Sequence, residues 1–143
     1  MNKSRKQQKG LAAVEFALIS PLIIVFMALY IEVGSMFIDY QTLNKAVRNG
    51  ARYAVTSIYG TATTQQIAPV AEIQNMVVYG RNPAVGNALL PGLAVDSVTV
   101  SHVSDVVTVT ANYNYQPYFA TLPFVGVDMS VNFSASAVME TGL

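Results

Sequence analysis

An apolar run of 21 residues, from Leu11 to Ile31, sets the first limit on the fold of this chain, because it contains a single charge, Glu15. As an α-helix with a rise of about 1.5 Å per residue, the run would span about 32 Å, which matches a bilayer core of about 30 Å. A secretory signal peptide has a shorter apolar stretch, usually about 7 to 15 residues. We therefore expect residues 11–31 to form a transmembrane helix.

The charges are divided unevenly between the two sides of this run. Four of the eight cations lie in the first nine residues with no acid among them, which leaves four cations against eight acids in the rest of the chain. By the positive-inside rule, the N-terminus lies in the cytoplasm and residues 32–143 are exported. The four N-terminal cations are Lys3, Arg5, Lys6 and Lys9.

The remaining composition argues against several classes of function. Residues 11–143 are acidic on balance and so lack the basic face that a nucleic-acid binder needs. The chain has no cysteine and one histidine, His102, so it offers neither a thiolate nucleophile nor a cysteine or histidine metal cluster. We expect no catalytic residues, no metal site, no cofactor and no small-molecule substrate, and an exported enzyme is the least favoured class.

The residues around the start of the apolar run carry a specific resemblance. The string from Lys9 to Phe16, KGLAAVEF, resembles the class III signal of type IV pilins and pseudopilins. The resemblance implies that a prepilin peptidase cuts after Gly10, removes residues 1–10 as a leader, and leaves Leu11 first and Glu15 fifth. Glycine at the cut suits a protease, because its missing side chain favours an extended, accessible backbone. It also implies that Glu15 pairs with the N-terminal amine of a neighbouring subunit and sets the register of assembly.

More narrowly, GLAAVEFALISPLI resembles the start of TadE-like proteins, the minor pilins or pseudopilins of the tight-adherence (Flp) pilus system. Phe16 after the glutamate, the segment Arg48–Arg52 (RNGAR) and the closing stretch Met129–Glu140 agree with that family. The resemblance implies a structural protein of the bacterial inner membrane, with its exported part in the periplasm or in surface pili. It implies as partners the prepilin peptidase, other pilins and the Tad inner-membrane assembly proteins.

Helical periodicity continues beyond the membrane to about Ile58. Phe16, Pro21, Leu22 and Ile23 belong to the membrane anchor, and Pro21 is expected to kink it. Outside the membrane, Arg48 and Arg52 are four residues apart and share a helix face. They are either contacts for an acidic partner subunit or solvated side chains.

The second half of the chain changes period from helical to alternating. A short helix is expected from about Val70, with Pro69 in its first turn and Gly80 at its end, followed by a loop over 81–94. Strands are expected at Val95–Val103, Val106–Gln116 and Val127–Met139, the first two joined by a tight hairpin, so that the sheet occupies about 95–139. One apolar sheet face and one apolar helix stripe must cover each other, which predicts a pilin-like α+β fold: a long N-terminal helix on an antiparallel sheet of about three strands.

Aromatic residues are densest between positions 113 and 125. They are either core residues between sheet and helix, or an exposed loop that docks on a neighbouring pilin or on the membrane, in which case Phe119 and Phe124 are candidate partner contacts. The alternative to a processed pilin is an unprocessed, single-pass envelope scaffold or binding protein.

Overall fold

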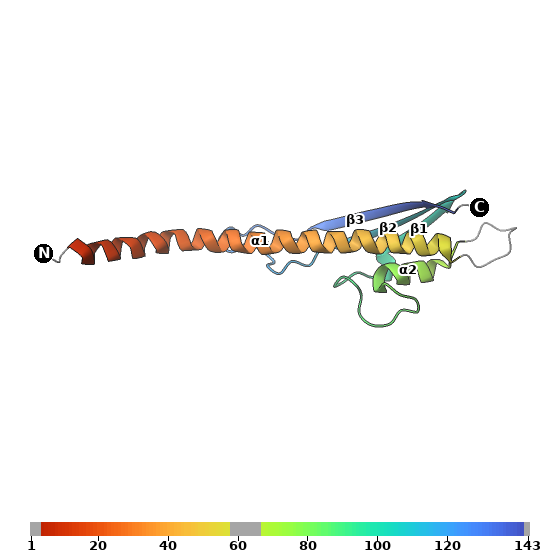
Figure 1. The fold of residues 1–143 in the computed structure, drawn as a ribbon, viewed down its shortest axis with the longest axis horizontal. Coiled ribbons are helices and arrows are strands. Elements are labelled where there is room, and N and C mark those ends of the chain that lie inside the picture. Colours follow the sequence, from red (N-terminus) through yellow and green to blue (C-terminus); the bar gives the residue numbers. More distant parts are fainter. Residues whose placement is uncertain (1–3, 58–66, 142–143) are drawn as a thin grey trace. The chain divides into compact units, whose positions relative to one another are not determined.

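Helix α1, Ser4–Thr56, forms the N-terminal part of the chain in a computed structural model that describes residues 4–57 and 67–141 (Figure 1). The chain divides into two compact units, which are described separately. The first comprises Met1–Ser35 and Pro117–Met129, and the second comprises Met36–Gln116 and Ser130–Leu143. The predicted last helical residue, Ile58, lies outside the described residues.

The second unit holds an antiparallel sheet of three strands in the order β1-β2-β3. The strands are β1 (Val98–Val103), β2 (Val106–Asn114) and β3 (Asn132–Glu140). The hairpin between β1 and β2 turns through two residues, because Val103 pairs with Val106. These elements confirm the expected α+β class and the expected number of strands.

The core of the second unit lies between one face of the sheet, the outer turns of α1 and helix α2 (Val70–Tyr79), which Figure 1 shows beside one another. The alternation along β2 places its apolar side chains inward, as predicted, and its Thr and Asn side chains on the other face. On that polar face the hydroxyls of Thr110 and Ser136 lie 3.0 Å apart on paired residues. The fully buried core residues include Leu43, Val47, Ala51, Ile73, Val77, Val107 and Val109.

The end of helix α2 agrees with the sequence prediction, whereas the starts of strands β1 and β3 differ from it. Helix α2 ends at Gly80, as predicted, with a left-handed φ of 70° and its N–H bonded to the Met76 carbonyl. The first strand begins three residues later than expected, because Val95–Ser97 forms a 3-10 turn. The third strand begins at Asn132 rather than Val127, because the N–H of Leu122 bonds the Val127 carbonyl within a separate loop.

Candidate functional site

The predicted cleavage point lies within helix α1. Gly10 and Leu11 are both exposed, Leu11 by 73%, and a Cβ on Gly10 would meet nothing within 4 Å. The expectation of an extended backbone at Gly10 is wrong, because leucine and alanine at positions 11–13 are strong helix formers that continue the helix across it. A glycine inside a helix still lowers its stability by about 1 kcal/mol relative to alanine, so α1 opens more readily here than at its neighbours.

Glu15 lies one turn further along α1 and is exposed, as is Phe16 beside it. The Glu15 carboxylate has no hydrogen bond or ion pair with any residue in the described ranges. An exposed carboxylate without a partner is stable in water, but placing an acidic side chain in hydrocarbon costs about 2.5 to 3.5 kcal/mol or more of free energy. The structure therefore presents a carboxylate on the surface of an apolar helix.

Pro21 lies inside α1, and the helix continues through it without a break. Proline has no N–H, so the Ala17 carbonyl four residues earlier loses its usual backbone donor. The Ser20 hydroxyl donates a hydrogen bond to that carbonyl over 3.2 Å. A serine side chain thus replaces the missing donor, which is how membrane helices tolerate proline.

The predicted anchor has an apolar outer surface. Leu22 and Ile23 are 56% and 45% exposed, and similar side chains surround them along α1. Within the described residues, the segment Gly10–Thr56 of α1 is long and apolar enough to cross a membrane. This exposed apolar surface indicates membrane anchoring.

Glu32, the first residue after the apolar run, was not among the predicted site residues. Its side chain is fully buried, and its two carboxylate oxygens accept hydrogen bonds from the backbone N–H groups of Tyr118 and Phe119, each over 3.2 Å. All three residues belong to the first unit. Only the position of Glu32 at the end of the run could have drawn attention to it, because its partners lie 86 and 87 residues away in sequence.

The aromatic stretch divides between core and surface. Tyr113, Tyr115 and Leu122 are buried, so the core interpretation holds for them. Phe124 is 77% exposed and Phe119 is 36% exposed, so both are accessible for contact with another molecule.

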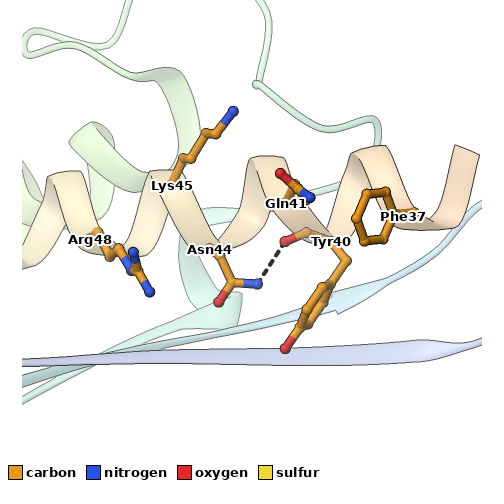
Figure 2. Close-up of a pocket in the computed structure, with 6 residues that line it drawn as sticks. All are labelled: Phe37, Tyr40, Gln41, Asn44, Lys45 and Arg48. Atoms are coloured by element: carbon orange, nitrogen blue, oxygen red, sulfur yellow. Dashed lines mark hydrogen bonds between the residues drawn. The ribbon is translucent and has the colours of Figure 1, made fainter.

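Arg48 and Arg52 are exposed on one face of α1, and Lys45 precedes them by one turn. None of these three cations forms an ion pair within residues 4–57 and 67–141. A shallow hollow of about 380 Å³ runs along this part of the helix. Figure 2 shows its lining side chains on successive turns of α1, with the Asn44 amide donating to the Tyr40 carbonyl over 2.8 Å. They are Phe37, Tyr40, Gln41, Asn44, Lys45 and Arg48.

The Arg48–Arg52 segment also has a packing role that the sequence did not reveal. Gly50 and Ala51 are buried, and a Cβ on Gly50 would collide with the Cγ2 methyl of Val77 on α2. Small residues therefore let α1 and α2 approach closely, while the flanking arginines face outward. One turn later, the Tyr53 hydroxyl donates to Oε2 of Glu72 over 2.6 Å, and this hydrogen bond raises the pKa of Tyr53.

His102 lies on the inner face of β1, and its Nε2 atom is buried without a hydrogen-bond partner in the described part of the chain. Within that part, no group of three or more His, Cys, Asp or Glu side chains is placed to hold a metal ion. His102 itself is half-buried on this face of the strand.

One family of known proteins matches part of helix α1. Residues 10–52 match the family model of TadE-like proteins, so the match starts at Gly10 and ends at Arg52. Over these residues the chain is similar to TadE-like proteins. This similarity confirms, for residues 10–52, the resemblance seen in the sequence. The TadE-like range contains Glu15, Glu32 and both arginines, whereas Phe119 and Phe124 lie beyond it. No curated protein and no solved structure matches the chain significantly.

Proposed function

We propose that this protein is a minor pilin or pseudopilin of a Tad (Flp) pilus, with a structural and non-catalytic role in pilus biogenesis and surface adherence. The observation that carries the proposal is the TadE-like match over residues 10–52, which begins at the glycine of the predicted cleavage point. The family is associated with the Tad pilus, and the long apolar helix supplies the membrane anchor. The exported α+β part would then extend from the anchor.

The first step would be cleavage between Gly10 and Leu11 by a prepilin peptidase at the cytoplasmic face of the inner membrane. Both residues are exposed on α1, so the bond is accessible once the helix opens locally. The opening is favoured by the low helix propensity of glycine. Cleavage would remove four cations with the leader and create a new amine on Leu11.

The second step would be assembly through the membrane segments of α1, in which Glu15 sets the register. An unpaired carboxylate among apolar helices is strongly destabilising, whereas one paired with an amine is tolerated. The new Leu11 amine of a neighbouring subunit is a cation at the same end of the same helix. The exposed and unpartnered state of Glu15 in the described chain supports this role.

The exposed cations Arg48 and Arg52, together with Lys45, would contact acidic side chains of a neighbouring pilin. After loss of the leader, each copy would carry eight acids against four cations, so an acidic neighbour is available even in another copy of this chain. Such surface pairs contribute mainly to orientation and specificity rather than to affinity.

Incorporation into filaments in a bacterium that makes the pilus tests the proposal. The protein should appear in the sheared pilus fraction in its cleaved form. Glu15→Ala should still be cleaved but should be lost from that fraction, and Glu15→Asp, which keeps the charge, should retain part of the incorporation. Normal incorporation of Glu15→Ala would refute the register role. Absence of the unaltered protein from pili and from the Tad assembly complex would refute the pilin assignment.

A further inference from the structure

We propose that the loop Pro117–Met129 is a membrane-docking element that lies in the bilayer interface at the C-terminal end of the apolar run, where Glu32 holds it. This inference rests on the proposed anchoring of residues 11–31 in the membrane. The loop and the anchor belong to the same compact unit, and Figure 1 shows the loop beside α1.

The position of the loop relative to the membrane surface follows from its hydrogen bonds to Glu32. This residue directly follows Ile31, the last residue of the apolar run, so its carboxylate lies at the boundary between hydrocarbon and water. Both of its oxygens accept backbone N–H groups at the start of the loop, from Tyr118 and Phe119. A buried carboxylate requires such donors, and these two bonds fix the loop at the level of the membrane surface.

The exposed side chains of the loop suit an interface between lipid and water. Among its residues only Asp128 is charged. Tyr118 and Phe124 are 76% and 77% exposed, and aromatic side chains of this kind concentrate where headgroups meet acyl chains. In the proposed arrangement lipid covers them, as it covers the exposed apolar side chains of α1. The exposed large apolar side chains of the loop are Tyr118, Phe119, Phe124, Val125 and Val127.

The backbone of the loop is also prepared for an apolar environment. The N–H of Leu122 bonds the Val127 carbonyl over 2.9 Å, and the N–H of Gly126 bonds the Leu122 carbonyl over 3.0 Å. These internal bonds reduce the number of polar groups that would lose water in the interface. Phe124 at the tip has a left-handed φ of 66°, which is unfavourable for a residue with a side chain. Such strain is typical of functional positions.

Fluorescence in vesicles tests the proposal, because the chain contains no tryptophan. The full chain carrying Val125→Trp is reconstituted in phosphatidylcholine and phosphatidylglycerol vesicles that contain lipid brominated near the headgroup. Val85→Trp is the matched control, because Val85 and Val125 are exposed by 58% and 59% and Val85 lies in the other unit. Phe26→Trp reports separately on insertion of the anchor. The matched control also accounts for the intrinsic preference of tryptophan for interfaces.

We expect the Val125→Trp variant to show blue-shifted emission and to lose emission in brominated vesicles, while Val85→Trp does neither. If Phe26→Trp is quenched and Val125→Trp behaves like Val85→Trp, loop docking is refuted although anchoring stands. If Phe26→Trp is not quenched, the anchoring on which the inference rests fails as well. A blue shift without quenching by lipid would assign the loop to a protein neighbour and would also refute the proposal.

The role of Glu32 as a positioning residue is tested in the same background. Glu32→Ala should reduce the quenching of Val125→Trp to the level of Val85→Trp, with quenching of Phe26→Trp unchanged. Asp39→Ala, which removes the next acid along α1, should leave the Val125→Trp signal as it was. Circular dichroism checks that each variant keeps its helix and sheet. Unchanged quenching in Glu32→Ala would refute the role of Glu32.

Discussion

The hydroxyl of Tyr113 donates a hydrogen bond to Oδ2 of Asp39 over 3.2 Å and so joins strand β2 to helix α1. Tyr113 lies on the buried face of β2 and is 2% exposed. Burial raises the pKa of Tyr113 to about 12, and the negative charge of Asp39 and the hydrogen bond to it act in the same direction. The protonated phenol is thus the form that the fold requires.

This link predicts a loss of stability in alkali. The folded state holds the Tyr113 proton more tightly than the unfolded chain, whose pKa is about 10. The contribution is therefore complete below pH 10 and is lost as the pH rises towards 12. Urea unfolding of the full chain in detergent micelles between pH 9 and pH 12 measures this loss, because the range starts below the lower pKa and reaches the higher one.

Tyr113→Phe should unfold more easily at neutral pH, by about 1 kcal/mol for one hydrogen bond, but should lose less stability in alkali. Tyr118→Phe removes an exposed hydroxyl and should follow the unaltered protein throughout. Parallel losses in all three proteins above pH 10 would contradict the role of Tyr113.

The close approach of Gly50 and Val77 predicts that Gly50→Ala destabilises the protein, although alanine is the better helix former. The added methyl would collide with Val77 Cγ2, and overpacking of this kind costs about 1 to 3 kcal/mol against a gain of about 1 kcal/mol in helix propensity. Urea unfolding gives the free energies. Val77→Ala in the same chain should recover part of the loss.

Gly34→Ala is the control for helix propensity. Gly34 lies on the same helix as Gly50, but a Cβ at Gly34 would meet nothing within 4 Å. It should stabilise α1 by up to about 1 kcal/mol. A Gly50→Ala variant that behaves like Gly34→Ala would show that the contact with Val77 does not limit the packing.

The hydrogen bond from Ser20 to the Ala17 carbonyl predicts that the effect of Ser20→Ala depends on whether residue 21 is proline. Ser20→Ala should remove the donor to the Ala17 carbonyl and shift its infrared amide band to higher frequency, because the Ser20 hydroxyl replaces the N–H that Pro21 lacks. In Pro21→Ala the backbone N–H returns, so Ser20→Ala should have little effect. Isotope-edited infrared spectra of the membrane segment, labelled at Ala17, measure both. Equal shifts in the two backgrounds would contradict the account.

The periodicity of apolar residues along the chain predicted most of the helices and strands. It did not predict contacts between residues that are far apart in the sequence. The apolar run predicted a helix from Leu11, whereas α1 already begins at Ser4. Alternation along β2 identified its buried face, and Gly80 marked the end of α2. Val127 and Met129 continue the same alternation, yet they belong to a loop whose hydrogen bonds close on Leu122 and Ala120.

The residues missed in the candidate site depend on packing between distant segments. In the sequence, Glu32 is an acid that flanks the apolar run, and nothing near it indicates that backbone N–H groups of a distant loop bind its carboxylate. Gly50 belongs to the segment that resembles the family. The sequence does not show why a glycine is needed there, which is that Val77 on helix α2 leaves no room for a side chain. Gly10 was expected to be extended because of its own flexibility, whereas its helix-forming neighbours determine its conformation.

The N-terminus of the mature protein tests the central claim most directly. Mass spectrometry of the protein purified from a bacterium that makes the pilus should find a chain that begins at Leu11, and Gly10→Ala should block that cleavage. A chain that retains Met1 or begins at Asn2 would contradict the pilin assignment and would favour an unprocessed membrane-anchored scaffold.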